Sequence, residues 1–349
     1  MKVNLLTIHY SLSCGAVLQT FATCKILESL GCEVTIINFK NPVELKRRKS
    51  VKFWLMNGIT KMKFDAFRRN YFPKSTVEMF HIDYASLPGA DCYVTGSDQI
   101  WNPKIVKENL YTYMLEFLPE QVKRISYASS FGLNEWNMPA EATEKVASLL
   151  GRFHSLSIRE GSGVEICRNV FKLRAMQVLD PTLLLSNYAD LIGHVIDTDE
   201  IVYFKLVYDK DITNIAAFLK RKLGMKNTLL YASYPRKGFD RNIMFCSPCT
   251  WLKKIASAKF VVTDSFHGLA FAILFQKQFI VYGGMKDRNT RLLSLLKMVG
   301  LEERYIQGYK ELIRTDLFDK PINYEVVNKI LEEERAKSLF YLKEALFGQ

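Results

Sequence analysis

Residues 3–39, VNLLTIHYSLSCGAVLQTFATCKILESLGCEVTIINF, decide the fold class. Residues 3–9 and 32–39 are short apolar runs typical of buried strands. Between them, residues 16–31 carry apolar side chains at helical spacing and close with Gly31, the residue type that commonly follows a helix. A strand, a glycine-containing loop, a helix and a second strand form a βαβ unit. This order indicates an α/β protein with a parallel sheet.

The same alternation continues along the rest of the chain and starts afresh at about residue 195. The pattern predicts further strands and helices, in chain order, at 90–95, 124–130, 139–153, 154–168 (a short strand, a charged loop and a helix), 175–180, 200–208, 211–224, 227–233, 249–258, 259–264, 266–275, 278–284 and 323–346. We therefore expect two doubly wound, Rossmann-like halves, residues 1–190 and 191–349. Their strand ends would face a central cleft, where such sheets usually bind ligands.

Charge and hydropathy narrow the range of partners. The chain has 349 residues and a formal net charge of +12, which favours anionic partners such as phosphorylated substrates or an acidic membrane surface. No nucleic-acid-binding signature accompanies the charge, so we expect no nucleic-acid partner. The start of the chain lacks a cleavable signal pattern, and no apolar run approaches the roughly 20 residues of a spanning helix. These features predict a soluble, cytoplasmic protein.

The seven cysteines are odd in number and scattered, which is typical of reduced, intracellular usage. Cys246 and Cys249 form one C-x-x-C pattern, but no second pair or matching histidines accompany it. We therefore interpret it as a loop and expect no metal and no cofactor.

The candidate reactive residue is His267, one of only five histidines, in the stretch KFVVTDSFHGLAFAILF at 259–275. Asp264–Gly268 would form a strand-to-helix corner at the carboxyl edge of a sheet, where backbone N–H groups favour an anion. An imidazole there can donate or accept a proton near neutral pH. Asp264 would either orient His267 or cap the helix, and the alternative for His267 is a hydrogen-bonded position in the core.

Seven motifs in order make the chain resemble the polysaccharide pyruvyl transferase family. They are GAVLQTFA at 15–22, VTGSDQIWNP at 94–103, SYASSFG at 126–132, SIREGSG at 157–163, LDPTLLL at 179–185, VVTDSFHGLAFAI at 261–273 and RNTRLLSLLKMVGLEER at 288–304. The resemblance implies transfer of pyruvate from phosphoenolpyruvate to a sugar of a surface polysaccharide or its lipid-linked precursor. A pyruvate ketal forms and phosphate is released. It also implies a glycosyltransferase-B-like fold and a donor that needs no metal for activation.

The resemblance also suggests roles for residues on the donor side. Ser265 and Gly268 are donor-binding candidates near His267, which matches the family's catalytic histidine. The family often carries an arginine two residues before that histidine, where this chain has Ser265. A donor-binding arginine must then come from elsewhere: Arg159 is the leading candidate, because a guanidinium can grip a carboxylate or phosphate with two hydrogen bonds. Arg288 and Arg291 follow, and the alternative for each arginine is an ion-paired or solvated position.

On the acceptor side, polar residues beside a tryptophan resemble a platform for a sugar ring. They are Ser97, Asp98, Gln99, Trp101 and Asn102. The alternative is a structural turn anchored by Trp101. Gly15 and Gln19 fit the first strand-to-helix corner, where the family's usual asparagine–aromatic pair is replaced by Ser13 and Cys14.

Residues 45–72 mix basic and aromatic residues, which suits either an amphipathic helix on an anionic inner membrane surface or a basic helix packed on its own domain. Two other functions remain open at this point. One is a glycosyltransferase that uses a nucleotide-sugar donor, and the other is a non-catalytic binding protein of capsule assembly.

Overall fold

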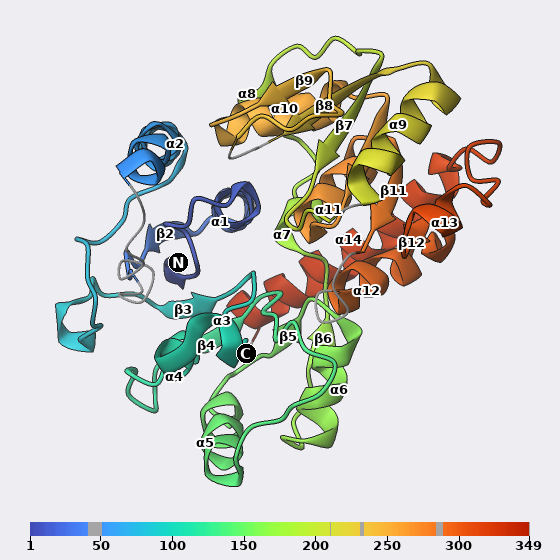
Figure 1. The fold of residues 1–349 in the computed structure, drawn as a ribbon. Coiled ribbons are helices and arrows are strands. Elements are labelled where there is room, and N and C mark those ends of the chain that lie inside the picture. The colour runs from blue at the N-terminus through green and yellow to red at the C-terminus, as the bar shows by residue number, and fades with distance from the viewer. Residues whose placement is uncertain (41–50, 210, 231–233, 284–288, 349) are drawn as a thin grey trace. The chain divides into compact units, whose positions relative to one another are not determined.

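The computed structural model describes residues 1–40, 51–209, 211–230, 234–283 and 289–348, without the side chains of residues 51–57 (Figure 1). The chain forms two compact units, each made of discontinuous segments. Unit 1 comprises Met1–Arg48, Asn70–Leu185 and Glu332–Gln349, and unit 2 comprises Lys49–Arg69 and Ser186–Leu331.

Unit 1 contains a four-stranded parallel sheet in the order β2-β1-β3-β4. Its strands are β1 (Lys2–Leu6), β2 (Glu33–Ile36), β3 (Cys92–Thr95) and β4 (Arg124–Ser126). A parallel pair, β5 (Ser157–Ile158) and β6 (Met176–Gln177), continues beyond β4 through bridges such as Ser129 to Ile158. The predicted βαβ unit is present, because β1 and β2 pair in parallel across helix α1 (Cys14–Ser29).

The strands of unit 1 are unbroken apolar runs in the sequence because their residues are buried in its core. All four residues of β3 and all but the first of β1 are buried, as expected when a parallel sheet is covered on both faces. The other helical segments of this unit are η2 (Tyr84–Ser86), α3 (Pro103–Val106), η3 (Lys107–Asn109), α4 (Leu110–Tyr113), α5 (Ala140–Gly151), α6 (Gly161–Asn169) and α7 (Pro181–Leu184).

Unit 2 contains a six-stranded parallel sheet in the order β12-β11-β10-β7-β8-β9. The strands are β7 (Glu200–Phe204), β8 (Lys226–Leu230), β9 (Arg241–Ile243), β10 (Phe260–Thr263), β11 (Gln278–Tyr282) and β12 (Tyr305–Ile306). Its helical segments are α8 (Ala189–Ile192), α9 (Asp211–Leu223), α10 (Pro248–Ser257), α11 (Phe266–Leu274), α12 (Asn289–Val299), η5 (Glu302–Arg304) and α13 (Tyr309–Leu312). The pattern did not predict β9 and β12, because these edge strands have only three and two residues and show no periodicity.

The long C-terminal helix α14 (Tyr324–Phe347) belongs to both units. Its last part lies in unit 1, where Leu342 and Leu346 join the core around β1 and β3. A division at residue 190 would assign all of α14 to the second half. The two compact units instead place Glu332–Gln349 in unit 1 and the preceding residues of α14 in unit 2.

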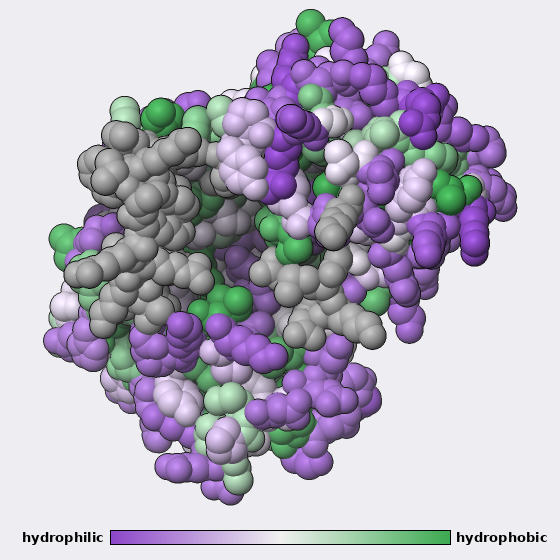
Figure 2. All heavy atoms as spheres, viewed as in Figure 1, coloured by the Kyte–Doolittle hydropathy of each residue, from purple (hydrophilic) through white to green (hydrophobic). Residues whose placement is uncertain are grey.

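Helix α2 (Val51–Tyr71) occupies most of the basic segment predicted at 45–72, and residues 45–50 lie outside the described part of the chain. Phe64 and Phe67 are buried, whereas Ile59 and Met62 are exposed. The face of the molecule shown in Figure 2 is mostly hydrophilic, with hydrophobic residues scattered over it. Among the helices that are described, none combines the length and the apolar character that crossing a membrane requires.

Candidate functional site

The predicted strand-to-helix corner is present in unit 2, where β10 ends at Thr263 and α11 begins at Phe266. Ser265 is the N-cap: its backbone is extended and its Oγ accepts a hydrogen bond from Gly268 N at 3.4 Å. The backbone N–H of Ser265 in turn donates to Thr263 Oγ1 at 3.0 Å. This chain of bonds fixes the first turn of α11 against the carboxyl end of β10.

Gly268 allows this close packing. A Cβ added at Gly268 would lie 2.3 Å from Thr263 Oγ1 and 3.3 Å from Phe204 Cδ1. A side chain at this position would therefore require Thr263 or the first turn of α11 to shift. The structure gives Gly268 a packing role, and its predicted contact with the donor stays a prediction.

His267 lies in the first turn of α11 and is only 7% exposed. Its ring meets the Phe266 ring edge-on, with centroids 5.3 Å apart. The guanidinium of Arg291, from the first turn of α12, lies 6.0 Å from the centroid of the same Phe266 ring. The structure therefore gathers two of the predicted donor-side residues, His267 and Arg291, around Phe266. Arg288 lies outside the described residues.

Asp264 does not cap the helix, so that part of the sequence interpretation is wrong. Its carboxylate instead accepts hydrogen bonds from the backbone N–H groups of Leu206 at 2.6 Å and Val207 at 3.0 Å. It also pairs with Lys205 Nζ at 3.2 Å. Asp264 thus ties the loop after β7 to the end of β10, and Ser265, whose Oγ accepts from Gly268 N, serves as the cap.

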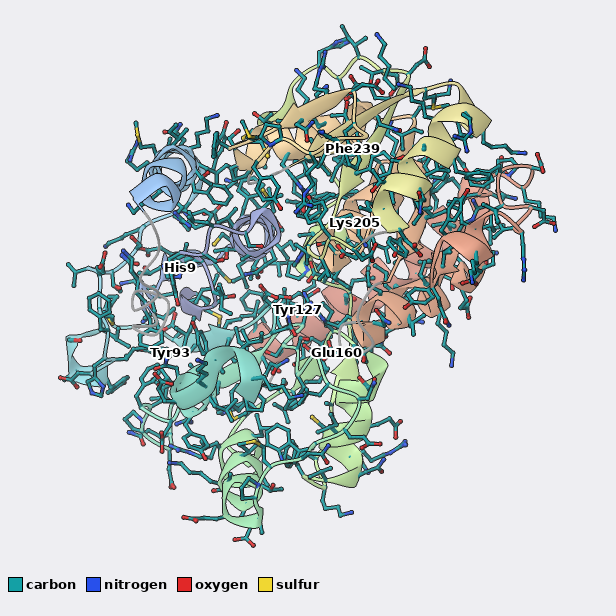
Figure 3. All side chains as sticks on the ribbon, in the orientation of Figure 1. His9, Tyr93, Tyr127, Glu160, Lys205 and Phe239 are labelled. Atoms are coloured by element: carbon teal, nitrogen blue, oxygen red, sulfur yellow. The ribbon has the colours of Figure 1, made fainter. Side chains whose placement is uncertain are left out.

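Lys205, labelled in Figure 3, is the main residue at this edge that the sequence interpretation missed. Its side chain is fully buried, and its ammonium donates to Tyr282 O at 2.6 Å and lies 4.0 Å from the Tyr282 ring centroid. Burial lowers the pKa of Lys205, and the carboxylate of Asp264 opposes that shift. Tyr282 OH donates to Asp209 Oδ2 at 2.6 Å, so residues from three neighbouring strand ends form one network.

The cap gives a first testable prediction. Ser265→Ala should lower the free energy of unfolding by about 0.5–1 kcal/mol, the lower part of the range for a lost N-cap, because its hydrogen bond is long. Urea denaturation measures the change. Exposed Ser186→Ala is the control and should stay within about 0.5 kcal/mol of wild type. A Ser265→Ala protein as stable as that control would mean that the cap contributes nothing.

In unit 1, Arg159 follows β5 and is engaged by carboxylates. Its Nη1 lies 2.7 Å from Asp180 Oδ2 and its Nη2 lies 3.7 Å from Asp98 Oδ1. The side chains of Arg159 and Asp180 are 1% and 0% exposed. Burial disfavours the charge of Arg159, but Asp180, Asp98 and Glu160 together raise the pKa of its guanidinium above the usual value.

Ser97 and Gln19 belong to the same buried network. Ser97 Oγ donates to Asp180 Oδ2 at 2.9 Å, and Ser97 N donates to Gln19 Oε1 at 3.2 Å. The amide nitrogen of Gln19 donates to Thr7 Oγ1 at 2.9 Å, at the end of β1. Gly15 is buried in the first turn of α1. The structure therefore brings together the two motifs around residues 19 and 97 at the carboxyl edge of the sheet.

Glu160, also labelled in Figure 3, is the N-terminal neighbour of α6 and is 1% exposed. Its Oε1 accepts from Ser130 Oγ at 3.0 Å and from Gly132 N at 2.9 Å. Glu160 therefore ties the loop after β4 to the loop after β5, and it adds a third carboxylate near Arg159.

Trp101 is not a sugar platform, and this prediction is wrong. Its side chain is 0% exposed and packs edge-on against Phe153 and at a tilt against Phe131. Its Nε1 donates to Tyr113 O at 3.2 Å. A ring enclosed on all sides cannot stack on a sugar, so the alternative of a structural anchor holds.

Asn102 and Gln99 order the turn that Trp101 anchors. Asn102 caps α3 by accepting from Lys104 N at 3.0 Å, and its amide donates to Gln99 Oε1 at 3.1 Å.

Cys246 is buried and Cys249 lies in the first turn of α10. No disulfide joins these two described cysteines.

A family model for polysaccharide pyruvyl transferase matches residues 14–284, which is most of the chain. The chain belongs to the polysaccharide pyruvyl transferase family. Membership implies a transferase that acts on polysaccharide. A search among curated proteins found no match.

Solved structures similar to this chain include glycosyltransferases and epimerases. The glycotransferase of kitacinnamycin has 10% identity and a TM-score of 0.54, and the match covers 99% of this chain and 97% of that chain. The UDP-GlcNAc 2-epimerase from Neisseria meningitidis has 12% identity and a TM-score of 0.52 over 100% of both chains. A putative UDP-N-acetylglucosamine 2-epimerase from Listeria monocytogenes has 12% identity and a TM-score of 0.54, with 100% and 97% covered. These likenesses concern the fold, and they confirm the predicted glycosyltransferase-B-like α/β class.

Sequence signals existed for some of the residues that were missed. Lys205 interrupts the apolar run IVYFKLVY, and a lone lysine at the end of a buried strand is unusual enough to mark a paired charge. Asp180 stood within the LDPTLLL motif without an assigned role. Their partners could not be read from the sequence, because each pair joins separate strand ends.

Proposed function

We propose that this protein transfers pyruvate from phosphoenolpyruvate to a sugar of a surface polysaccharide or its lipid-linked precursor. The product is a pyruvate ketal, and phosphate is released. The observation that carries the proposal is the family match over residues 14–284, together with a histidine in the first turn of a helix at a sheet's carboxyl edge.

The proposed reaction requires a proton donor, and the strand-to-helix corner of unit 2 contains a candidate for it. Carbon C3 of phosphoenolpyruvate gains a proton, C2 bonds to two sugar oxygens, and the bond from C2 to the phosphate oxygen breaks. The two hydroxyls release two protons: one balances the proton given to C3, and the other leaves with phosphate. His267 is our candidate for the general acid that protonates C3, because imidazole exchanges protons near neutral pH.

Several groups support donor binding near His267. The N-terminal N–H groups of α11 carry partial positive charge. Arg291 lies at Phe266, beside His267, and supplies a full positive charge. Asp264 acts by holding Lys205 and the loop after β7 in place. With these groups the donor needs no metal ion for binding.

A lipid-linked acceptor would be presented at a membrane surface. Helix α2 exposes Ile59 and Met62 beside Lys61 and Lys63, a combination that suits shallow contact with anionic lipid. We therefore include peripheral contact with the inner membrane surface in the proposal. Co-sedimentation with phosphatidylglycerol vesicles, compared with phosphatidylcholine vesicles, decides whether this contact forms.

The donor assignment makes a prediction that needs no acceptor. Phosphoenolpyruvate should stabilise the protein by about 2.7 kcal/mol at 100 times its dissociation constant, with or without EDTA, because it binds only the folded state. Thermal denaturation with a phosphoenolpyruvate titration measures this. Stabilisation by a nucleoside diphosphate, with no effect of phosphoenolpyruvate, would favour a nucleotide-sugar glycosyltransferase instead.

The complete reaction is tested with the same protein. Incubation with phosphoenolpyruvate and lipid-linked oligosaccharides should release phosphate and add the mass of a pyruvate ketal to one of them. Phosphate release without any change in acceptor mass would contradict ketal formation.

A further inference from the structure

The loop Gly96–Asp98 of unit 1 is fixed by three separate elements. Gln19 of α1 accepts from Ser97 N at 3.2 Å, and Asp180 at the start of α7 accepts from Ser97 Oγ at 2.9 Å. Ser130, after β4, donates its N–H to Asp98 O at 3.1 Å. The backbone on both sides of Asp98 is therefore held before any ligand arrives.

Asp98 differs from its neighbours in its access to solvent. Its side chain is 17% exposed, whereas those of Arg159 and Asp180 are 1% and 0% exposed. Its Oδ1 accepts from Gln99 N at 2.8 Å and faces Arg159. Among the residues that the structure describes, no hydrogen bond or ion pair to Oδ2 is found, so this oxygen can accept a hydrogen from a ligand.

The backbone of Asp98 also has an unusual conformation. Its φ is 71°, a left-handed value that most residues adopt only at a cost and that Asp and Asn tolerate best. Such residues persist where the surrounding structure holds them, and they often occur at binding and catalytic sites. The bonds to Ser97 and to the carbonyl of Asp98 supply that restraint here.

The surroundings of Arg159 do not suit an anionic donor. Asp180, Asp98 and Glu160 all act on its guanidinium, so one positive charge stands among three carboxylates. The local excess of negative charge repels a phosphate or carboxylate and leaves a neutral hydroxyl unaffected. With 1% of its side chain exposed, Arg159 also has almost no surface left for a ligand.

We infer that Arg159 is a positioning residue on the acceptor side: it holds Asp98, and Asp98 accepts a hydrogen bond from an acceptor sugar hydroxyl. The inference rests on the proposed function for the identity of the acceptor as a sugar. It differs from the sequence-based assignment of Arg159 as a donor ligand.

The test measures binding of sugar and donor separately. Binding of methyl α-D-glucopyranoside, methyl α-D-mannopyranoside and methyl β-D-galactopyranoside is followed by saturation-transfer NMR, and binding of phosphoenolpyruvate is followed by calorimetry. Asp98→Asn keeps the left-handed backbone but removes the charge. It should weaken binding of the sugar that wild type binds best by about 10- to 100-fold, the loss expected for a hydrogen bond to a charged group. Donor binding should not change.

Arg159→Lys keeps the charge but loses the forked guanidinium that reaches both Asp180 and Asp98. It should weaken sugar binding by about tenfold or more, again with unchanged donor binding. The double variant with Asp98→Asn should be no weaker than the worse single variant, because both act through one carboxylate. Glu116→Gln, which breaks an exposed pair with Lys145, is the control and should bind both ligands as wild type does.

Melting temperatures show which variants are folded. If Arg159→Lys does not fold, the sugar and donor affinities of Asp98→Asn alone test the inference. Three results would overturn the inference. The first is weaker phosphoenolpyruvate binding in Arg159→Lys, and the second is a loss of sugar affinity in the double variant equal to the sum of the two single losses. The third is wild-type protein that binds none of the sugars. If phosphoenolpyruvate bound neither wild type nor any variant, the proposed function would be contradicted. The sugar-binding measurements would still decide whether Asp98 binds a sugar hydroxyl and Arg159 positions it.

Discussion

Replacing His267 with glutamine should lower kcat for phosphoenolpyruvate-dependent phosphate release by about 10²–10⁴-fold. This corresponds to about 2.7–5.4 kcal/mol of activation free energy, the usual contribution of a positioned general acid. Glutamine keeps hydrogen-bonding groups and approximate volume but cannot deliver a proton to carbon C3 of the donor. Steady-state kinetics at saturating phosphoenolpyruvate measures the change.

Stability and donor binding separate this role from a structural one. His267 is 7% exposed, so a purely structural histidine would show its loss as a lower melting temperature with normal turnover by the folded fraction. The catalytic role instead predicts slow turnover at nearly unchanged melting temperature and donor affinity. Exposed His194→Gln, in the same unit, is the matched control and should behave as wild type. A folded His267→Gln protein that turns over at the wild-type rate would falsify the role.

The unit 2 corner could be predicted from the sequence because its determinants are local. An apolar strand, a short polar turn and an apolar helix follow each other within residues 259–275, and the structure has β10, Ser265 and α11 in that order. Capping by Asp264 was one of two alternatives, and the cap proves to be the next residue, because Asp and Ser are both good caps. Only the contacts of Asp264 with Lys205 and the loop after β7 distinguish them.

Arg159 shows what sequence reasoning cannot supply. An arginine in a polar loop after a strand is compatible with binding an anion or with a buried ion pair. The choice depends on which carboxylates other strand ends bring to it. Asp180 and Asp98 arrive from loops after β6 and β3, and neither pairing follows from periodicity. Parallel sheets collect such residues at one edge, so their motifs are visible in the sequence while their partners are not.

Trp101 was misinterpreted for a related reason. The motif GSDQIWNP has the composition of a sugar-binding loop, but composition does not reveal on which side of the loop a ring lies. Here Ser97 joins the buried polar network at the sheet edge, and Trp101 enters the hydrophobic core together with Phe131 and Phe153. The first half of the motif therefore contributes to the polar site, and the second half contributes to the hydrophobic core.

Trp101→Ala should consequently lower the free energy of unfolding by about 3–5 kcal/mol, the usual cost of removing a large aromatic side chain from a core. The ring is 0% exposed, and its removal leaves a cavity beside Phe131 and Phe153 and removes one of the two hydrogen bonds that Tyr113 O accepts, the other coming from Thr95 Oγ1. Urea denaturation of the full chain, followed by far-ultraviolet circular dichroism, measures the loss.

Phe340→Ala is the matched control, because Phe340 lies on α14 in unit 1 and is 64% exposed. Its loss should change stability by no more than about 0.5 kcal/mol, since a solvated ring has little packing to lose. A sugar platform would give the opposite result for Trp101→Ala: nearly wild-type stability with weakened sugar binding. That outcome would return Trp101 to the acceptor site and would require the indole to leave the core, which its contacts with Phe131, Phe153 and Tyr113 oppose.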